Sequence, residues 1–425
     1  MKRFVLLSLM MLTVLTSQAQ TLDECCKLAR ENYPEIRQYD LIAETEQYNI
    51  SNAARAWIPQ VVFSGQATYQ SATPTYPEAF NQIIAASGLD MSGVRKDQYK
   101  VAIDVSQNIW DGGLSKANRA IAEAEAAEQR SRVDASLYDL QSRIQNLYFG
   151  ILLLDERVEQ TETLIEVLDA NLNRMHTYYK NGVAMQSDVD AIEAELLTAR
   201  QTLGQVEASR ASFRRMLEVF IGRPLTDETL TRPAMVEVAS RTSLRPELAM
   251  FDAQSNKLVA QRKAITTSVM PRFSAFAQGY YGYPGLDMFK SMVSSEWTLN
   301  AIVGVRMSWN IGAFYTQKNN LSKLDAAERQ IAIQRDVFLF NTEMQTTQDA
   351  DEIVRLRSAL EDDNRIVELR RSVRMAAESR LENGVIDATD LLRKIADETT
   401  ATLSRSTHEI ELLQATYRLK TTLNQ

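Results

Sequence analysis

The chain contains an internal duplication, and this feature constrains its fold more than any other. Pro34-Glu35 recurs as Pro246-Glu247 at a separation of 212 residues. Farther along, the separation becomes 202 residues, and Asn181-Gly182-Val183 recurs as Asn383-Gly384-Val385. Matches that keep a fixed separation over a long stretch indicate two copies of one structural unit, which together share a core.

We therefore predict a first structural repeat over residues 20–221 and a second over residues 246–425, joined by residues 222–245. Each repeat contains a long tract with almost no proline or glycine: no proline lies between Pro77 and Pro224. These tracts are rich in helix-forming residues, and their apolar residues recur at spacings of three and four, which is typical of coiled coils. Each tract is predicted to form a long helix and a return helix, at about 114–180 and 185–221 and again at about 314–381 and 386–424.

The two helices of each pair differ in length, since the first would extend ~100 Å and its return helix only ~55 Å. The helical segments at residues 34–57 and 246–269 are expected to lie beside the rest of the long helices.

Four segments of a different kind lie between the helices. Their residues alternate between apolar and polar, as in strands with one apolar face. The expected strands cover about residues 60–70, 99–110, 272–282 and 297–310. Tryptophans stand at or beside the strand ends, as an aromatic girdle at a membrane interface requires. They are Trp57, Trp110, Trp297 and Trp309. A soluble β-sandwich with these tryptophans in its core is the competing interpretation.

The number of strands predicts an oligomer if the strands span a membrane. Four strands cannot close a barrel, and an open sheet edge in lipid would leave amides unpaired. Several copies of the chain must then share one barrel. Asp104 and Arg306 occupy equivalent positions on the polar faces, so we expect them to line the lumen, where charge is tolerated.

The N-terminus predicts export. Lys2 and Arg3 precede a short apolar run, and Ser17-Gln18-Ala19 offers small residues for cleavage after Ala19, so residues 1–19 are interpreted as a signal peptide. The formal net charge of −8 argues against nucleic acid as a partner. No later stretch is long and apolar enough for a transmembrane helix. Cys25 and Cys26 are adjacent, which favours two buried thiols on a short helix over a disulfide.

With these features assembled, the sequence resembles the TolC-like outer-membrane efflux family over nearly all of the mature chain. The resemblance rests on the duplicated order of elements and on Ile109-Trp110-Asp111-Gly112-Gly113 before the long helix. It also rests on the turn Tyr178–Val183 with Ser187-Asp188-Val189, repeated at Asn383-Gly384-Val385 with Thr389-Asp390-Leu391.

The resemblance implies a mixed, mainly α fold in a homotrimer. Each chain would give four strands to a 12-stranded transmembrane β-barrel, which continues into a 12-helix periplasmic α-barrel of coiled-coil helices. Residues 222–245 would form an equatorial linker. The protein would sit in the outer membrane of a Gram-negative bacterium as the passive exit duct of a tripartite efflux or secretion system. Its partners would be a periplasmic adaptor (membrane fusion) protein, an inner-membrane pump and outer-membrane lipid.

The resemblance also implies roles for the helical turns. The periplasmic tips, which would contact the adaptor, are Asn181, Gly182, Val183, Ser187, Asp188, Asn383, Gly384, Val385 and Thr389. Asp390 would contribute to an acidic constriction, but Arg393 replaces a second expected acid and Leu381 replaces a gating tyrosine. A competing interpretation makes Asp188 and Asp390 helix N-terminal acids that the helix dipole favours.

No catalytic or cofactor-binding motif was found, so we expect no enzyme activity, cofactor or metal site. His176 lies near Met175 and Met185, but methionine in a helix seam is more often packing than copper ligation. The alternative to a duct is a soluble periplasmic coiled-coil scaffold or adaptor protein. The sequence identifies neither the cargo nor the particular adaptor and pump.

Overall fold

A computed structural model describes residues 20–424 apart from 87–92, 226–229, 237–241 and 384. The predicted signal peptide and Gly384 therefore lie outside the described residues. The helices and strands follow one another in the order α2 (Leu22–Asn32), η1 (Pro34–Arg37), α3 (Gln38–Arg55), β1 (Gln60–Tyr69), α4 (Glu78–Ala86), β2 (Asp97–Trp110), α5 (Leu114–Lys180), α6 (Gln186–Ile221), α7 (Pro246–Ser268), β3 (Arg272–Tyr283), α8 (Met288–Val293), β4 (Thr298–Ser308), α9 (Ala313–Glu382) and α10 (Ala388–Leu423).

The chain is mainly helical with one four-stranded sheet, as the sequence predicts. It divides into two compact units whose bounds differ from those of the two predicted repeats, because each long helix contributes to both units. Unit 1 comprises residues 1–39, 131–250 and 334–425, and unit 2 comprises residues 40–130 and 251–333.

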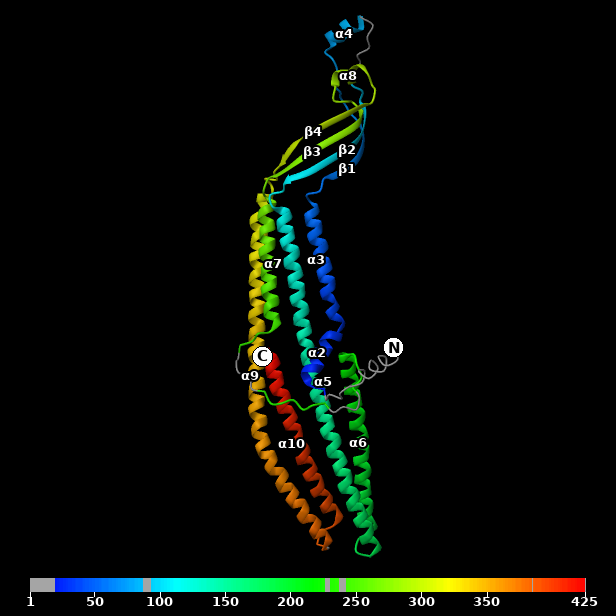
Figure 1. The fold of residues 1–425 in the computed structure, drawn as a ribbon, viewed down its shortest axis with the longest axis vertical. Helices are drawn as coiled ribbons and strands as arrows, with labels where there is room; N and C mark the ends of the chain where they lie inside the picture. The colour runs from blue at the N-terminus through cyan, green and yellow to red at the C-terminus, as the bar shows by residue number, and fades with distance from the viewer. Residues whose placement is uncertain (1–19, 87–92, 226–229, 237–241, 384, 425) are drawn as a thin grey trace, which may run out of the picture. The chain divides into compact units, whose positions relative to one another are not determined.

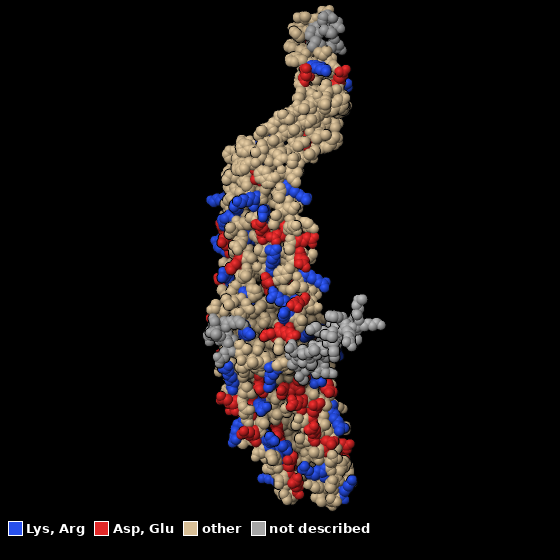
Figure 2. Space-filling model, in the orientation of Figure 1, with Lys and Arg blue, Asp and Glu red and all other residues tan. Residues whose placement is uncertain are grey.

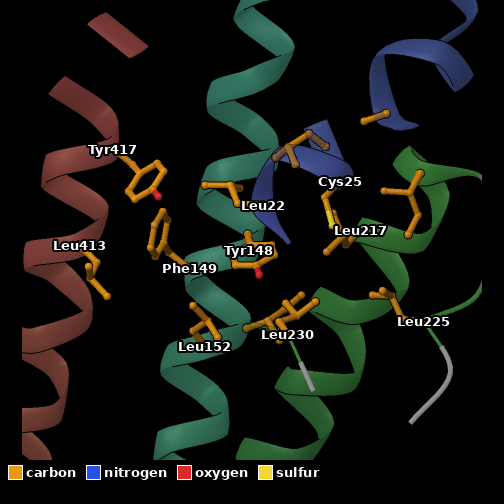
Figure 3. Packing of buried hydrophobic residues seen from close by; sticks show 14 of the residues in the cluster. Leu22, Cys25, Tyr148, Phe149, Leu152, Leu217, Leu225, Leu230, Leu413 and Tyr417 are labelled. Carbon is orange, nitrogen blue, oxygen red and sulfur yellow. The ribbon is translucent and has the colours of Figure 1, made fainter. Parts of the chain in front are cut away.

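Unit 1 is built on antiparallel helix pairs. Its largest core gathers side chains from α2, α5, α6 and α10 around Tyr148 and Phe149, which are 0 % and 1 % exposed. Figure 3 shows Leu217 of α6 and Leu413 of α10 packing toward these rings from the two sides. The rings themselves meet edge to face with centroids 6.1 Å apart. The apolar stripes that the three- and four-residue spacings predict therefore form a real helical core.

The seam between α9 and α10 is more polar than the seam of the first repeat. Asp349 of α9 has no exposed surface, and its carboxylate accepts hydrogen bonds from Arg418 Nε (2.6 Å) and Gln345 Nε2 (2.9 Å). Thr342 and Thr346 are also buried and donate to carbonyls one turn earlier. Buried polar groups are tolerated in a helix seam when each finds a partner, as these do.

Unit 2 contains the sheet, in which all four strands are antiparallel and lie in the order β1-β2-β3-β4 (Figure 1). Beneath the strands, ion pairs join the helices of this unit. Arg130 of α5 pairs with Glu46 of α3, Lys257 of α7 contacts Glu128 of α5 at 2.5 Å, and Arg262 of α7 pairs with an aspartate of α9. Long helix α5 is thus held by both of the helices beside it in this unit.

Two short helices between the strands were not predicted. Helix α4 lies between β1 and β2, and α8 lies between β3 and β4. Both are too short to show a helical period in the sequence. Contacts between the loops hold them, because Tyr76 packs near Phe80 and Phe289, with ring centroids 5.8 and 6.4 Å apart. Among the described residues, no helix combines the length and the apolar character needed to cross a membrane.

Candidate functional site

Most of the large apolar side chains of the four strands lie on one face of the sheet. The pairing places Phe63, Ile103, Gly279 and Ala301 in one row across the strands. Residues on this face are large, apolar and strongly exposed. The most exposed are Phe63 (74 %), Leu299 (82 %), Val303 (79 %) and Val305 (70 %). An exposed apolar face of this extent is typical of a surface that contacts a membrane or another protein, because its exposure to water is unfavourable.

The side of the sheet that Figure 2 shows is also nearly free of charge. Figure 2 shows lysine, arginine, aspartate and glutamate densely distributed over the helices and sparse over the strands. Outer-membrane strands have this distribution, because a charge on a lipid-facing position is destabilising.

The opposite face of the sheet carries the polar groups. Gln278 of β3 lies between two charges of β2: it accepts a hydrogen bond from Lys100 Nζ at 3.0 Å and donates to the Asp104 carboxylate. Arg306 of β4 stacks its guanidinium 4.7 Å from the centroid of the Phe276 ring. The register puts Asp104 and Arg306 on the same face, opposite the apolar one. Lys100 lies on the same polar face as Asp104 and Arg306. It could have been predicted from the sequence, because Lys100 and Asp104 both occupy polar positions in the alternating pattern of β2.

The tryptophans mark both ends of the sheet. Trp57, Trp110 and Trp309 lie where the strands meet the helices, and Trp309 Nε1 donates to the carbonyl of Val269 at 2.9 Å. At the other end, Trp297 packs against Tyr99 and Tyr281, with ring centroids 6.1 and 5.4 Å away. All four tryptophans are between 40 % and 49 % exposed, so none is a core residue of this chain.

The Asp-Gly-Gly motif makes the junction between β2 and α5. Gly112 and Gly113 both have positive φ, at 72° and 90°. The Asp111 carboxylate accepts from the backbone N–H of Gly113 (2.9 Å) and Ser115 (2.7 Å) and from the Ser115 hydroxyl. Burial raises the pKa of Asp111, but these hydrogen bonds outweigh burial and the net pKa is lowered. Asp111 is therefore a charged cap that starts the long helix.

The turn between α5 and α6 is a glycine-terminated helix end. Gly182 has φ 72°, and its N–H donates to the carbonyl of Tyr179 at 3.0 Å. The N–H of Val183 donates to the carbonyl of Tyr178 at 2.9 Å. This pair of bonds defines a Schellman motif, which needs a left-handed residue where Gly182 stands. In the second repeat, Val385 donates to the carbonyl of Arg380 at 2.9 Å, which is the equivalent bond.

Most of the predicted tip residues are at the surface. Val183 is 70 % and Val385 is 68 % exposed. Also exposed are Asn181, Gly182, Ser187, Asn383 and Thr389. Met185, which we did not predict, is 73 % exposed and adds to the apolar surface of the first turn.

The two equivalent aspartates behave differently. The Asp188 carboxylate accepts from the Met185 N–H at 2.9 Å and so serves as a cap at the start of α6. In α10 the side chain of Asp387 provides the cap by accepting from the Asp390 N–H at 2.8 Å. This leaves the Asp390 carboxylate half-exposed, 4.0 Å from Arg393. The helix-acid interpretation thus fits Asp188 better than Asp390.

Side chains near the two turns share one core within unit 1. Met175 of α5, Val189 and Ile192 of α6, and Leu381 of α9 belong to it, with Leu391 of α10. Leu381 is 9 % exposed, so the residue that stands in place of a gating tyrosine packs as an ordinary apolar side chain. An ion pair between Arg174 of α5 and Glu382 of α9 (3.3 Å) borders this core.

The two cysteines lie in unit 1 on α2 and form no disulfide. Burial in apolar surroundings raises the pKa of Cys25 to about 11 and that of Cys26 to about 12. Thiolates are the reactive form, and raised pKa values keep both thiols protonated at neutral pH. We predict that the folded protein reacts with Ellman's reagent at pH 8 far more slowly than a free thiol, and that both cysteines react at once after denaturation. Fast native labelling of both would contradict the burial of α2.

Comparisons with known proteins agree with this geometry. The sequence model of the outer membrane efflux protein family matches residues 26–223. No curated protein matches the sequence significantly. Among solved structures, the outer membrane protein VceC from Vibrio cholerae is 14 % identical, with a TM-score of 0.68 and 95 % of each chain covered.

Two further channels have the same fold. The Campylobacter jejuni CmeC outer membrane channel is 11 % identical, with a TM-score of 0.67, and the match covers 95 % of this chain and 85 % of that one. The Neisseria gonorrhoeae MtrE outer membrane channel, in its open state, is 13 % identical, with a TM-score of 0.66 and coverage of 95 % and 88 %. The family model matches residues 26–223, and the fold of these channels extends over 95 % of this chain, so the chain is similar to outer membrane efflux proteins in the sequence of its first half and in fold along almost its whole length.

Proposed function

We propose that this protein is the outer-membrane exit duct of a tripartite efflux or secretion system and conducts cargo passively to the exterior. Its place is the outer membrane of a Gram-negative bacterium, with the helices extending into the periplasm. The observation that carries the proposal is the sheet, which has one exposed apolar face, one polar face and aromatic side chains at both ends. In a soluble coiled-coil scaffold, the exposed apolar face of such a sheet would be unfavourable.

Completion of the duct requires further copies of the chain, and three copies would give the twelve strands expected. Strands β1 and β4 each pair on one side only in the described sheet. Helix α9 also presents apolar residues that no other part of the described chain covers, at spacings of four, three and four. They are Ile333 (62 % exposed), Val337 (53 %), Phe340 (63 %) and Met344 (59 %). Lipid excludes open sheet edges and water disfavours apolar stripes, so both features favour neighbours of the same kind.

The exposed helical turns are the proposed contact with a periplasmic adaptor, which would link the duct to an inner-membrane pump. Val183, Met185 and Val385 are about as exposed as the lipid-facing strand residues. They project from turns whose backbone is fixed by hydrogen bonds, so the apolar groups are presented rigidly.

Asp390 and Arg393 are the proposed constriction residues, and Asp104 and Arg306 the proposed lumen residues. Because the Asp390 carboxylate does not cap its helix, it is free to act on ions in the duct. We predict that Asp390→Ala weakens block of the open channel by divalent cations in planar bilayers several-fold, since the carboxylate ring would be lost. Asp188→Ala, which removes a capping carboxylate, is the matched control and should leave cation block unchanged. Equal block in the wild type and Asp390→Ala would remove Asp390 from the constriction.

Deletion of the gene followed by complementation tests the proposed function. We expect the deletion strain to accumulate a fluorescent dye or to become sensitive to detergents, and the intact gene to restore export. A variant lacking β1 and β2 should not restore it. Recovery of the mature wild-type protein in the soluble periplasmic fraction would overturn the proposal.

A further inference from the structure

Gln20 occupies an unusual position for a residue that follows a predicted cleavage site. It precedes Thr21, the N-cap residue of α2, and is only 3 % exposed. Its backbone carbonyl accepts from the Tyr148 hydroxyl at 2.8 Å and from the Thr231 N–H at 3.2 Å. If the signal peptide is removed after Ala19, the new N-terminus is therefore anchored inside unit 1 instead of trailing in solvent.

The side-chain oxygen of Gln20 makes the main hydrogen bonds of this side chain. With the amide oriented to satisfy its neighbours, the oxygen accepts from Arg223 Nη2 at 2.5 Å and from Arg223 Nε at 2.9 Å. In the reverse orientation the oxygen would face only the Cys25 thiol at 3.6 Å, which is a weak donor. The charge-assisted pair with Arg223 decides the orientation. The amide nitrogen then faces sulfur and contributes little.

A charged α-ammonium group at this position would be costly. Gln20 is almost fully buried and its side chain contacts the Arg223 guanidinium, so an α-ammonium group on the same residue would lose solvation and lie near a like charge, which disfavours ionisation. Glu24 is already paired with Arg223 at 3.1 Å. Asp23, the other nearby acid, is exposed, and an ion pair with an exposed carboxylate contributes little.

From this placement we propose that Gln20 of the mature protein is cyclised to pyroglutamate. The neutral α-amine attacks Cδ of the side-chain carboxamide, a Cδ–N bond forms, and the side-chain nitrogen leaves as ammonia. The reaction needs no oxidant, reductant or other co-reactant. The resulting five-membered lactam is uncharged, keeps a carbonyl oxygen as an acceptor within reach of the long Arg223 side chain, and lacks the amide NH₂ that the site hardly uses. The inference rests on the predicted cleavage and is independent of channel function.

Peptide mass spectrometry of the mature protein, purified from membranes, tests the modification. The protein is denatured and its free amines are reductively methylated before digestion, so that cyclisation during digestion cannot be mistaken for the native state. Trypsin then cleaves only after arginine, so we expect the peptide ending at Arg30 to begin at Gln20, to be unmethylated at its N-terminus and to be lighter by one ammonia. A methylated Gln20 α-amine, or a mature chain starting at another residue, would overturn the proposal.

A second measurement tests whether a free α-amine at position 20 destabilises the folded protein. Gln20→Ala leaves the cleavage site intact but cannot cyclise, so the variant carries a free α-amine with an ordinary pKa of about 8. Burial would lower that pKa in the folded state, and a depressed amine pKa makes stability rise with pH. We expect the apparent melting temperature of the variant to increase by about 2–4 °C between pH 6 and pH 9 relative to wild type.

The buried Cys25 thiol and Tyr148 hydroxyl should not mask the effect, because their pKa values lie above this range. Burial raises the pKa of Cys25 to about 11 and raises that of Tyr148 further. If the melting temperatures of the variant and the wild type change with pH in the same way, the free α-amine of the variant is not destabilising, and this explanation is wrong.

Discussion

Phe63→Arg should abolish the assembled form of the protein in the outer membrane. Phe63 lies in the middle of β1, is 74 % exposed and belongs to the apolar face of the sheet. An arginine on a lipid-facing strand position near the bilayer midplane costs about 2–4 kcal/mol, and the proposed trimer would contain three copies of it. We expect loss of the heat-resistant oligomer band on unheated gels and degradation of the unassembled chain.

Ser64→Arg is the matched control, because the adjacent residue of the same strand points to the opposite face. Ser64 is paired with Ala102, and the neighbouring rows of that face contain Lys100 and Asp104. A charge on the polar face should face water in the lumen, so this variant should assemble normally. If both variants assemble, or if only Ser64→Arg fails, the assignment of the two faces is wrong.

Gly112→Ala should strongly destabilise the junction between β2 and α5. Gly112 has φ 72°, and an added Cβ would lie 2.7 Å from Cβ of Met270. The left-handed conformation alone costs a residue with a side chain about 1–2 kcal/mol, and the close contact adds to it because neither atom can move without the backbone. We expect the apparent melting temperature, measured by circular dichroism in detergent, to fall by several degrees.

Two other glycines separate the causes of this effect. Gly182 has the same φ of 72° but open space around its added Cβ, so Gly182→Ala should show the conformational cost alone. Gly204 lies within α6 and also has open space, so Gly204→Ala should be neutral or stabilising by up to about 1 kcal/mol. A different order of stability among the three variants would contradict the geometry of the strand–helix junction.

Much of the fold follows from local pattern. The long helices could be predicted because proline and glycine are excluded from their tracts, and the strands because alternation places one apolar face on each. The duplication then related the two repeats. Sequence could not give the strand register, because that depends on pairing between strands far apart in the chain. It also missed α4 and α8, which are held by contacts between loops.

The sequence nominates the candidate residues, but it does not determine the hydrogen bonds that each of them makes. Asp188 and Asp390 are equivalent in sequence, yet the residue three positions earlier decides what each does. Met185 has no capping side chain, so Asp188 bonds its N–H, whereas Asp387 caps its own helix and leaves Asp390 exposed. Thr342, Thr346 and Asp349 interrupt the apolar pattern of the second repeat, but the partner of Asp349 could not be predicted, because Arg418 comes from another helix.

The copy number of the complete duct is the quantity on which the account depends most. Each chain supplies four strands with two unpaired edges. Native mass spectrometry of the protein, extracted from outer membranes in mild detergent, measures the number of chains directly. We predict a complex of three mature chains that survives at low protein concentration. A monomer, or a complex that stays dispersed in buffer without detergent, would contradict it.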